Sequence, residues 1–518
     1  MKRPLLQRLG RAFRAAWQEV KGQSRGAYDG ANVHRLLLDW ITQARAADEE
    51  IKGDLRLLRA RARELGRNDS TVKRYFRLLV NNVVGHHPTG MQLQAQVKLP
   101  SGELDTATND EIESAWTDWA TSPVTVDGKL TLRRFEKLIL KTMACDGEAF
   151  VRIWRGFEAN RHGLALQAID ADLLDETFNR LRQGGLNEIR MGVEIDLVGR
   201  PVAYHFWSAE QSQWAVKRER VRIPAEEILH LYDPERVNQT RGVTWIHSIM
   251  VPTHMLNAYF ESEAVASRIA ASSQGWFERQ PDSLAGNLGD SKKPALKDAN
   301  PGQYDYVPDG YTLKTFAPEH PTAQFLSFIK GMGRKIASGL SVFYNVLFND
   351  AEGVTYSTMR SFGLVERDDW KSIQQDFIDQ WRRPLQSVWT AMALLTGALR
   401  LPSRVASRYL AVRHRARGWQ WMDPEKEVKA AVLAIKNGLG SRTSFLGERG
   451  LDIEDVLDEL ANEERLAEER GVSISDFLPA DEKTDEDEED EDRPRGNGDR
   501  SKASRRNRLE PALRGEDS

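Results

Sequence analysis

The chain has 518 residues, of which 40% are hydrophobic and 29% charged, and its formal net charge is −4. This length allows about two to four domains, and the single cysteine, Cys145, excludes an internal disulfide framework and a cysteine-based zinc site. We expect Cys145 to be a small buried residue. Residues 471–518 hold 15 acids and 9 bases, so the rest of the chain carries a net charge of only +2. A protein that wraps DNA tightly is usually more basic than this. A nearly neutral protein still allows DNA to pass close by without binding tightly.

The N-terminal segment is basic and amphipathic. Residues 5–20 place leucines, Phe13 and Trp17 on one face and arginines on the other. This pattern is typical of a helix at a membrane surface or of one that packs on a partner protein. The segment lacks the uncharged apolar core of a secretory signal, and no apolar run reaches the ~18 residues of a transmembrane helix. We therefore expect a cytoplasmic protein without a membrane partner.

The first half of the chain predicts a mixed region of helices and strands. Helical periodicity covers residues 48–66, 70–79, 109–121 and 130–145. The segment Asn68-Asp69-Ser70 supplies an N-cap for the second of these helices. Alternating patterns predict strands over 149–154 and 228–231, and a hairpin of 191–197 with 202–207.

The second half predicts long helices around one polar loop. The expected order is a helix over 244–273, an exposed loop over 281–303, a hairpin of 303–307 with 312–316, a helix over 319–340, and a helix over 356–395 interrupted at Gly363 and Pro384. Between the last two helices lies a short, polar and flexible segment, Asn349-Asp350-Ala351-Glu352-Gly353. This order of a helix, a loop and a long helix suits a protein element that spans a distance or lines a passage. It suits a small catalytic pocket less well.

The C-terminal part predicts a return to the mixed region and then a helical end. A strand and loops are expected over 398–422, followed by helices over 424–437, 441–449 and 452–470. The acidic block 481–492 and the basic block 493–514 cannot bury enough surface to fold, so a disordered tail is expected.

Common catalytic and metal-binding motifs are absent from the sequence, including a phosphate-binding loop, a zinc-protease helix and a calcium loop. A cluster of four acids follows an expected strand: Asp170, Asp172, Asp175 and Glu176. A solvated turn is the favoured interpretation, and a divalent-metal site is the alternative. We interpret His86 and His87, which precede a Pro-Thr-Gly turn, as loop residues.

An arginine-rich stretch precedes Trp419 and Trp421. It contains Arg400, Arg404, Arg408, Arg413, Arg415 and Arg417, with no acid among them. Basic and aromatic residues together can indicate nucleic-acid binding. The same composition also suits a subunit interface that acids of a neighbour complement, and both interpretations stay open.

Several short motifs occur in an order that resembles the lambda family of phage portal proteins. They are Tyr28-Asp29-Gly30-Ala31 with Trp40, residues 61–68, Asn82-Val83-Val84-Gly85, residues 192–196 with 199–204, Pro234-Glu235-Arg236 with 239–243, residues 356–360, and residues 423–427 with 438–439 and 441–442. The resemblance runs from about residue 27 to residue 470. Thr244 and Thr355 depart from it, standing where the family often has Ser and Asn, and the tail has no counterpart.

The resemblance implies an α+β, mainly helical portal-protein fold. Its parts would be an N-terminal arm (1–50), an α/β wing (51–242), a first stem helix (243–273), a small β-containing clip (274–318), a second stem helix (319–340), a tunnel-loop region (341–355), a long helix with the wing return (356–422), a helical crown (423–470) and the tail (471–518). It also implies a ring, usually dodecameric, at one vertex of the phage head, with DNA passing through an axial channel during packaging and ejection.

The resemblance also implies partners and channel-lining residues. The partners would be double-stranded DNA, the terminase large subunit, the major capsid and scaffold proteins, and the head-tail connector proteins, with no cofactor, metal or active site. The channel would be lined by Lys330, Arg334, Asn349, Asp350, Ala351, Glu352, Gly353, Val354 and Thr355, and the clip would contact terminase or connector through Lys292, Lys293 and Asp309.

Around a ring, Lys330 and Arg334 would form positive belts that hold phosphates loosely, unless acids of the next subunit pair with them. Asp350 and Glu352 would form an acidic constriction that brushes DNA. The rival function is a metal-dependent DNA-processing enzyme that uses Asp170, Asp172 and Glu176. The virion is the expected final location, after assembly in the host cytoplasm.

Overall fold

The computed structural model describes residues 43–158, 160–209, 217–271, 275–279, 311–315, 324–419, 424–449, 451 and 453–471. The expected N-terminal helix over 5–20, the clip residues Lys292, Lys293 and Asp309, and nearly all of the tail lie outside these ranges. The chain divides into a large unit, residues 1–433 with 448–450, and a small unit, residues 434–447 with 451–518.

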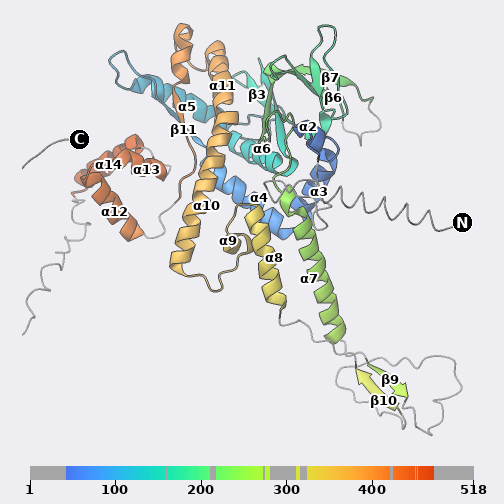
Figure 1. Cartoon of the computed structure of the whole chain (residues 1–518). Coiled ribbons are helices and arrows are strands. Elements are labelled where there is room, and N and C mark those ends of the chain that lie inside the picture. The colour runs from blue at the N-terminus through green and yellow to red at the C-terminus, as the bar shows by residue number, and fades with distance from the viewer. Residues whose placement is uncertain are drawn as a thin grey trace, which may run out of the picture. The chain divides into compact units, whose positions relative to one another are not determined.

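Helices predominate in the first described part of the large unit (Figure 1). They are α2 (Ala47–Ile51), α3 (Leu55–Asn68), α4 (Ser70–Val83), α5 (Thr106–Thr121) and α6 (Leu132–Asp146). The prediction of one helix over 48–66 is wrong at residues 52–54, where a turn containing Gly53 separates α2 from α3. The cap prediction is confirmed, because the Asp69 carboxylate accepts a hydrogen bond from the Val72 amide at 2.8 Å.

Two antiparallel sheets follow. One has the order β3-β2-β8 and the other β4-β5-β6-β7. Their strands are β2 (Glu148–Arg155), β3 (Leu164–Ile169), β4 (Glu188–Arg190), β5 (Val193–Ile195), β6 (Pro201–Trp207), β7 (Arg220–Pro224) and β8 (Ile228–Tyr232). The predicted strands over 149–154 and 228–231 and the hairpin of β5 with β6 are confirmed. The β5 strand starts two residues late because Met191 and Gly192 have positive φ.

The two predicted stem helices are present, with shorter limits. The first, α7 (Met250–Ala271), begins after a 3-10 turn η5 (His247–Ile249), and α8 (Phe325–Gly339) is the second. They lie beside one another through aromatic contacts, such as Tyr259 with Phe328, whose ring centroids are 4.7 Å apart. Between them, β9 (Gly275–Arg279) pairs with β10 (Tyr311–Thr315). The strand predicted over 312–316 is therefore present, its described partner is β9, and 303–307 lies outside the described residues.

The long helix predicted over 356–395 is confirmed, but with a π turn inside it. It consists of α10 (Tyr356–Phe377), the π turn η6 (Ile378–Arg382) and α11 (Arg383–Thr396). Gly363 lies within α10 without a break, and Pro384 follows the π turn at the start of α11. The first buried residue of α10 is Trp370, and the turns before it are held by partly exposed contacts, such as the stacking of Phe362 on Phe343 with 4.6 Å between ring centroids.

The chain then returns to the first helices. A 3-10 segment η7 (Ser403–Leu410) leads to β11 (Val412–Arg415), which pairs with β1 (Gln92–Ala95). The large unit has a core rich in tryptophan, in which Trp116, Trp119 and Trp389 contact one another. The predicted buried position of Cys145 is confirmed. The three C-terminal helices predicted are α12 (Pro424–Lys436), α13 (Arg442–Glu448) and α14 (Ile453–Glu469).

Candidate functional site: the tunnel loop and its support

The tunnel loop, residues 349–355, follows the short helix α9 (Tyr344–Phe348) and ends at α10. Asn349 caps α9 in the left-handed region with φ 55°, and Gly353 has φ 70°. The Thr355 hydroxyl accepts a hydrogen bond from the Thr358 amide at 3.3 Å, which caps α10. Residues of these types are those that turns and caps need, so the sequence specifies the two ends of the loop locally.

The acids of the loop contact the second stem helix of the same subunit. The Lys330 ammonium lies 2.6 Å from the Glu352 carboxylate and 3.8 Å from that of Asp350. The hydrogen bond to Glu352 raises the pKa of Lys330 above its usual value. Asp350 also accepts bonds from the Glu352 amide at 3.0 Å and the Tyr344 hydroxyl at 3.2 Å. These contacts, led by the bond from the Glu352 amide, lower the pKa of Asp350.

A cavity of 670 Å³ lies between α8, the tunnel loop and the start of α10. Residues from all three elements line it, among them Lys330, Arg334, Tyr344, Asp350, Glu352 and Phe362. The Arg334 guanidinium lies 5.9 Å from the centre of the Tyr344 ring. The structure brings together Lys330, Arg334 and the loop acids around this cavity. The contact between Lys330 and the acids of its own subunit was not predicted. The hydrogen bond from the Tyr344 hydroxyl to Asp350 was not predicted either.

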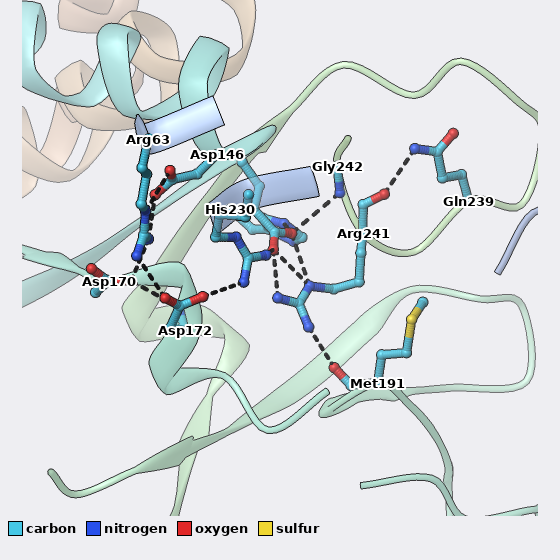
Figure 2. Close-up of polar contacts among 11 residues, drawn as sticks. Arg63, Asp146, Asp170, Asp172, Met191, His230, Gln239, Arg241 and Gly242 are labelled. Atoms are coloured by element: carbon cyan, nitrogen blue, oxygen red, sulfur yellow. Dashed lines mark hydrogen bonds and ion pairs between the residues drawn. The ribbon is translucent and has the colours of Figure 1, made fainter. Parts of the chain in front are cut away.

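A buried carboxylate joins the first sheet to α3 and the segment before α7. Glu148, at the start of β2, is fully buried and pairs with Arg241 at 2.5 Å and with Arg59 of α3 at 2.9 Å. It also accepts bonds from the His230 ring at 3.1 Å and the Gly242 amide at 3.2 Å. Figure 2 shows Arg241 beside His230 and Gly242, with a further bond to the Met191 carbonyl. Burial opposes ionisation of Glu148, but Arg241 and His230 hold its pKa below the usual range.

Close backbone packing places Glu148. A side chain on Gly242 would meet the Gly147 carbonyl oxygen at 2.0 Å, and Gly147 has φ +90°. Glycine at both positions lets the 239–243 segment lie against the end of α6. The sequence analysis missed this cluster, although the motif over 239–243 and the basic α3 helix contained its two arginines.

The acidic turn pairs with arginines. Arg63 bonds to Asp146 at 2.7 Å, to Asp170 at 2.8 Å and to Asp172 at 2.6 Å, and Arg59 also bonds to Asp172 (Figure 2). The hydrogen bond to Asp146 raises the pKa of Arg63. Asp170 and Asp172 are 43% and 50% exposed, so the prediction of a solvated turn is right about exposure but missed the arginine partners.

Asp175, which the sequence analysis grouped with that turn, is buried and bonds instead to Arg220. Among the described residues, no group of three or more His, Cys, Asp or Glu side chains could hold a metal ion. Of the three carboxylates that the rival function would use, Asp170 and Asp172 are bound to guanidinium groups.

The arginine-rich stretch also has partners inside the subunit. Arg408 donates to the Lys98 carbonyl at 2.5 Å, and Arg417 donates to the Asn81 carbonyl at 2.9 Å. Arg415 is buried, and the Trp419 indole donates to Asn82 at 3.1 Å. Much of this stretch thus anchors the wing return. His87, predicted as a loop residue, contacts the Thr89 hydroxyl within the loop before β1.

A second buried pair fixes the long helix at its π turn. Arg382 and Glu136 of α6 are both fully buried, with their charged groups 2.5 Å apart. Glu136 also accepts a hydrogen bond from the Trp381 indole at 2.9 Å. The π turn places the consecutive residues Trp381 and Arg382 in the core together. The long helix is therefore anchored at its middle, far along the chain from the tunnel loop.

Comparison with known proteins identifies the class first, as a structural component of a bacteriophage particle. The sequence matches the family described as phage portal protein, lambda family, over residues 34–374. It is 32% identical over 488 residues to the probable portal protein of Halomonas phage phiHAP-1, covering 90% of this chain and 93% of that protein. It is 21% identical over 472 residues to portal protein B of Escherichia phage lambda, covering 82% and 87%.

The chain therefore belongs to the lambda family of phage portal proteins. Its function is that of a portal protein, the conduit for the phage genome at one vertex of the head. A chain from the neck of a native GTA particle aligns with 75% of this chain and 93% of its own length at 13% identity, with a TM-score of 0.40. No helix within the described residues is long and apolar enough to cross a membrane.

Proposed function

We propose that twelve copies of this chain close into a ring whose axial channel is lined by α8 and the tunnel loop. Membership of the portal family is the observation that carries this proposal. A head-to-tail contact between identical subunits must close into a ring or extend into a filament, and a conduit needs the closed form. The parts of the chain then take the roles of wing, stem, clip, crown and tail over the ranges given above.

Exposed apolar side chains on the stem and on α10 support the proposal that a neighbouring subunit packs against them. Val251 and Met255 on α7 are both 60% exposed, and Leu326 on α8 is 64% exposed. Phe362 and Val365, on the first turns of α10, are 51% and 63% exposed. Grouped apolar residues of this kind on a soluble subunit mark protein contacts. In the ring, the next subunit covers them.

The proposed channel wall has mixed charge. Lys330 is partly neutralised by Asp350 and Glu352 of its own subunit, so the positive belts come mainly from Arg334. Arg334 makes no ion pair with a carboxylate in the described part of the chain. The exposed loop acids repel phosphate, so DNA passes the loop without strong adhesion. Loose contact of this kind suits a conduit through which a long polyanion has to move in both directions.

The partners follow from this role. Double-stranded DNA occupies the channel, terminase and then the connector proteins meet the clip, and the major capsid and scaffold proteins surround the ring. Assembly takes place in the host cytoplasm and the ring ends in the virion. No catalytic step is assigned to any residue, because a conduit and docking ring needs none.

Electron microscopy and mass measurement of the purified full chain test the proposal. The expected result is a closed ring with a central hole. A stable monomer or a two-fold dimer under all solution conditions would overturn it. A matched pair of variants tests the apolar contact: Val365→Ser should weaken ring closure, whereas Leu181→Ser, which removes a 76% exposed leucine from the wing, should leave closure unchanged.

A further inference from the structure

The tunnel loop is joined to the second stem helix by an ion pair that water can reach. Glu352 is 76% exposed and Lys330 is 29% exposed, with 2.6 Å between their charged groups. None of the residues 349–355 is buried. The other polar contacts of Asp350 come from α9 or from within the loop itself. The position of the loop against α8 therefore depends on an exposed, reversible contact instead of a packed core.

The cavity behind the loop makes a change of position physically simple. It measures 670 Å³ and separates Glu352, Gly353 and Val354 from the first turns of α10. Because the loop is not packed on this side, it can move without losing buried apolar contacts. Its two ends are fixed by the Asn349 and Thr355 caps, so movement would be confined to residues between them.

We propose that the contact of Lys330 with Glu352 and Asp350 is a latch that DNA opens. Backbone phosphates compete with the two carboxylates for the Lys330 ammonium, so DNA in the channel frees the loop from α8. This inference rests on the proposed lining of the channel by α8 and the loop.

The charges of the duplex act on both sides of the latch. A DNA duplex carries about one negative charge per 1.7 Å of its axis, and lysines that bind it release condensed counterions. The same phosphates repel Asp350 and Glu352 when they lie within a Debye length, which is about 8 Å at physiological ionic strength. DNA thus removes the partner of the loop acids and pushes the acids away. The loop stays closed in an empty channel and opens in a filled one.

A spin label on the loop measures this change. Cys145 is buried and is the chain's single cysteine, so Ala351→Cys, at an exposed position, adds one accessible thiol for the label. The assembled full-length ring is compared with and without a short blunt DNA duplex at low salt. The label should shift from a restricted to a mobile spectrum when the duplex is added.

Two substitutions in the labelled ring separate the latch from a general effect of charge. Glu352→Gln should give the mobile spectrum without DNA and little further change with it. Asp368→Asn is the matched control, because it removes a carboxylate that is also 76% exposed and whose lysine partner, Lys371, is on its own helix. That control should behave like the unsubstituted ring.

Cross-linking of the duplex to the ring near Lys330 distinguishes two kinds of failure. If the duplex cross-links there and the label stays restricted, the latch is wrong and the channel lining stands. If no cross-link forms at α8 or the loop, the proposed lining fails and the latch fails with it. Equal mobility of the label in the Glu352→Gln ring and the unsubstituted ring without DNA would also overturn the latch.

Discussion

Replacing Glu148 by glutamine tests the buried network that holds the wing. The substitution keeps the shape of the side chain but removes the charge between Arg241, which is fully buried, and Arg59, which is 2% exposed. Removing one partner of a buried ion pair costs about 3–5 kcal/mol, because the remaining charge has no compensation. Arg59 keeps its 2.6 Å bond to Asp172, so we expect a loss toward the lower end of that range.

A matched control involves an arginine of the same strand. Glu227→Gln also removes a carboxylate from an arginine of β2, Arg152, but these side chains are 34% and 26% exposed. Half-exposed pairs contribute about 1 kcal/mol or less. Guanidinium unfolding of the full chain, followed by tryptophan fluorescence, should show a large drop in midpoint for Glu148→Gln and a small one for Glu227→Gln. Equal drops in midpoint for the two variants would refute the assignment of Glu148 as a buried charge that stabilises the fold through its ion pairs.

The same network makes stability depend on pH in a defined direction. Burial lowers the pKa of His230 in the folded protein, so the unfolded chain takes up a proton near its ordinary pKa of about 6.5 and the folded chain does not. Stability should therefore fall as the pH drops below about 6.5, with a slope of at most about 1.4 kcal/mol per pH unit from this group. The lowered pKa of Glu148 adds a loss below about pH 4.3. Above pH 5 the unfolding midpoint should depend less steeply on pH in His230→Asn than in the unsubstituted chain, and an unchanged slope would contradict the assignment.

Three further predictions concern the channel and the tail. Replacing residues 350–353 by a Gly-Ser link should spare ring formation but impair genome packaging or retention, and heads that fill and hold DNA normally would remove the loop from the mechanism. Changing both Lys330 and Arg334 to alanine should reduce the salt-dependent binding of short DNA to the ring, which filter binding at several salt concentrations can measure, and an unchanged salt slope would argue against phosphate contact. Deleting residues 479–518 should leave rings intact by electron microscopy, since the composition of this segment offers almost nothing to pack, and failure to assemble would show that the tail is structural.

The sequence predicted most local structure because local structure depends on neighbouring residues. Apolar periodicity located the two stem helices and the long helix, and alternation located the β5–β6 hairpin. The segment Asn68-Asp69-Ser70 was predicted to cap α4 because such short polar side chains can accept from a helix amide, and the structure shows that Asp69 does so. Limits were less accurate, as at α7, where a 3-10 turn precedes the regular helix.

The order of short motifs determined the family by itself, and with it the expected function. The polar composition of the tunnel loop was also readable from the sequence, because few other residue types suit a turn between two helices. The clip contacts and the tail stay predictions, since they lie outside the described residues.

Only the tertiary structure decided which charges meet. Arg59, Glu148 and Arg241 are far apart in the chain, and nothing in their local sequence shows that they share one buried site. The acidic turn suggested a metal site or a solvated loop. In the structure α3 lies beside this turn, and its arginines bind the carboxylates of the turn. Residues of one helix face or one strand follow a period that the sequence reveals, whereas pairing between distant elements depends on how those elements pack. For the same reason, the Lys330–Glu352 contact, on which the latch depends, could be found only in the folded chain.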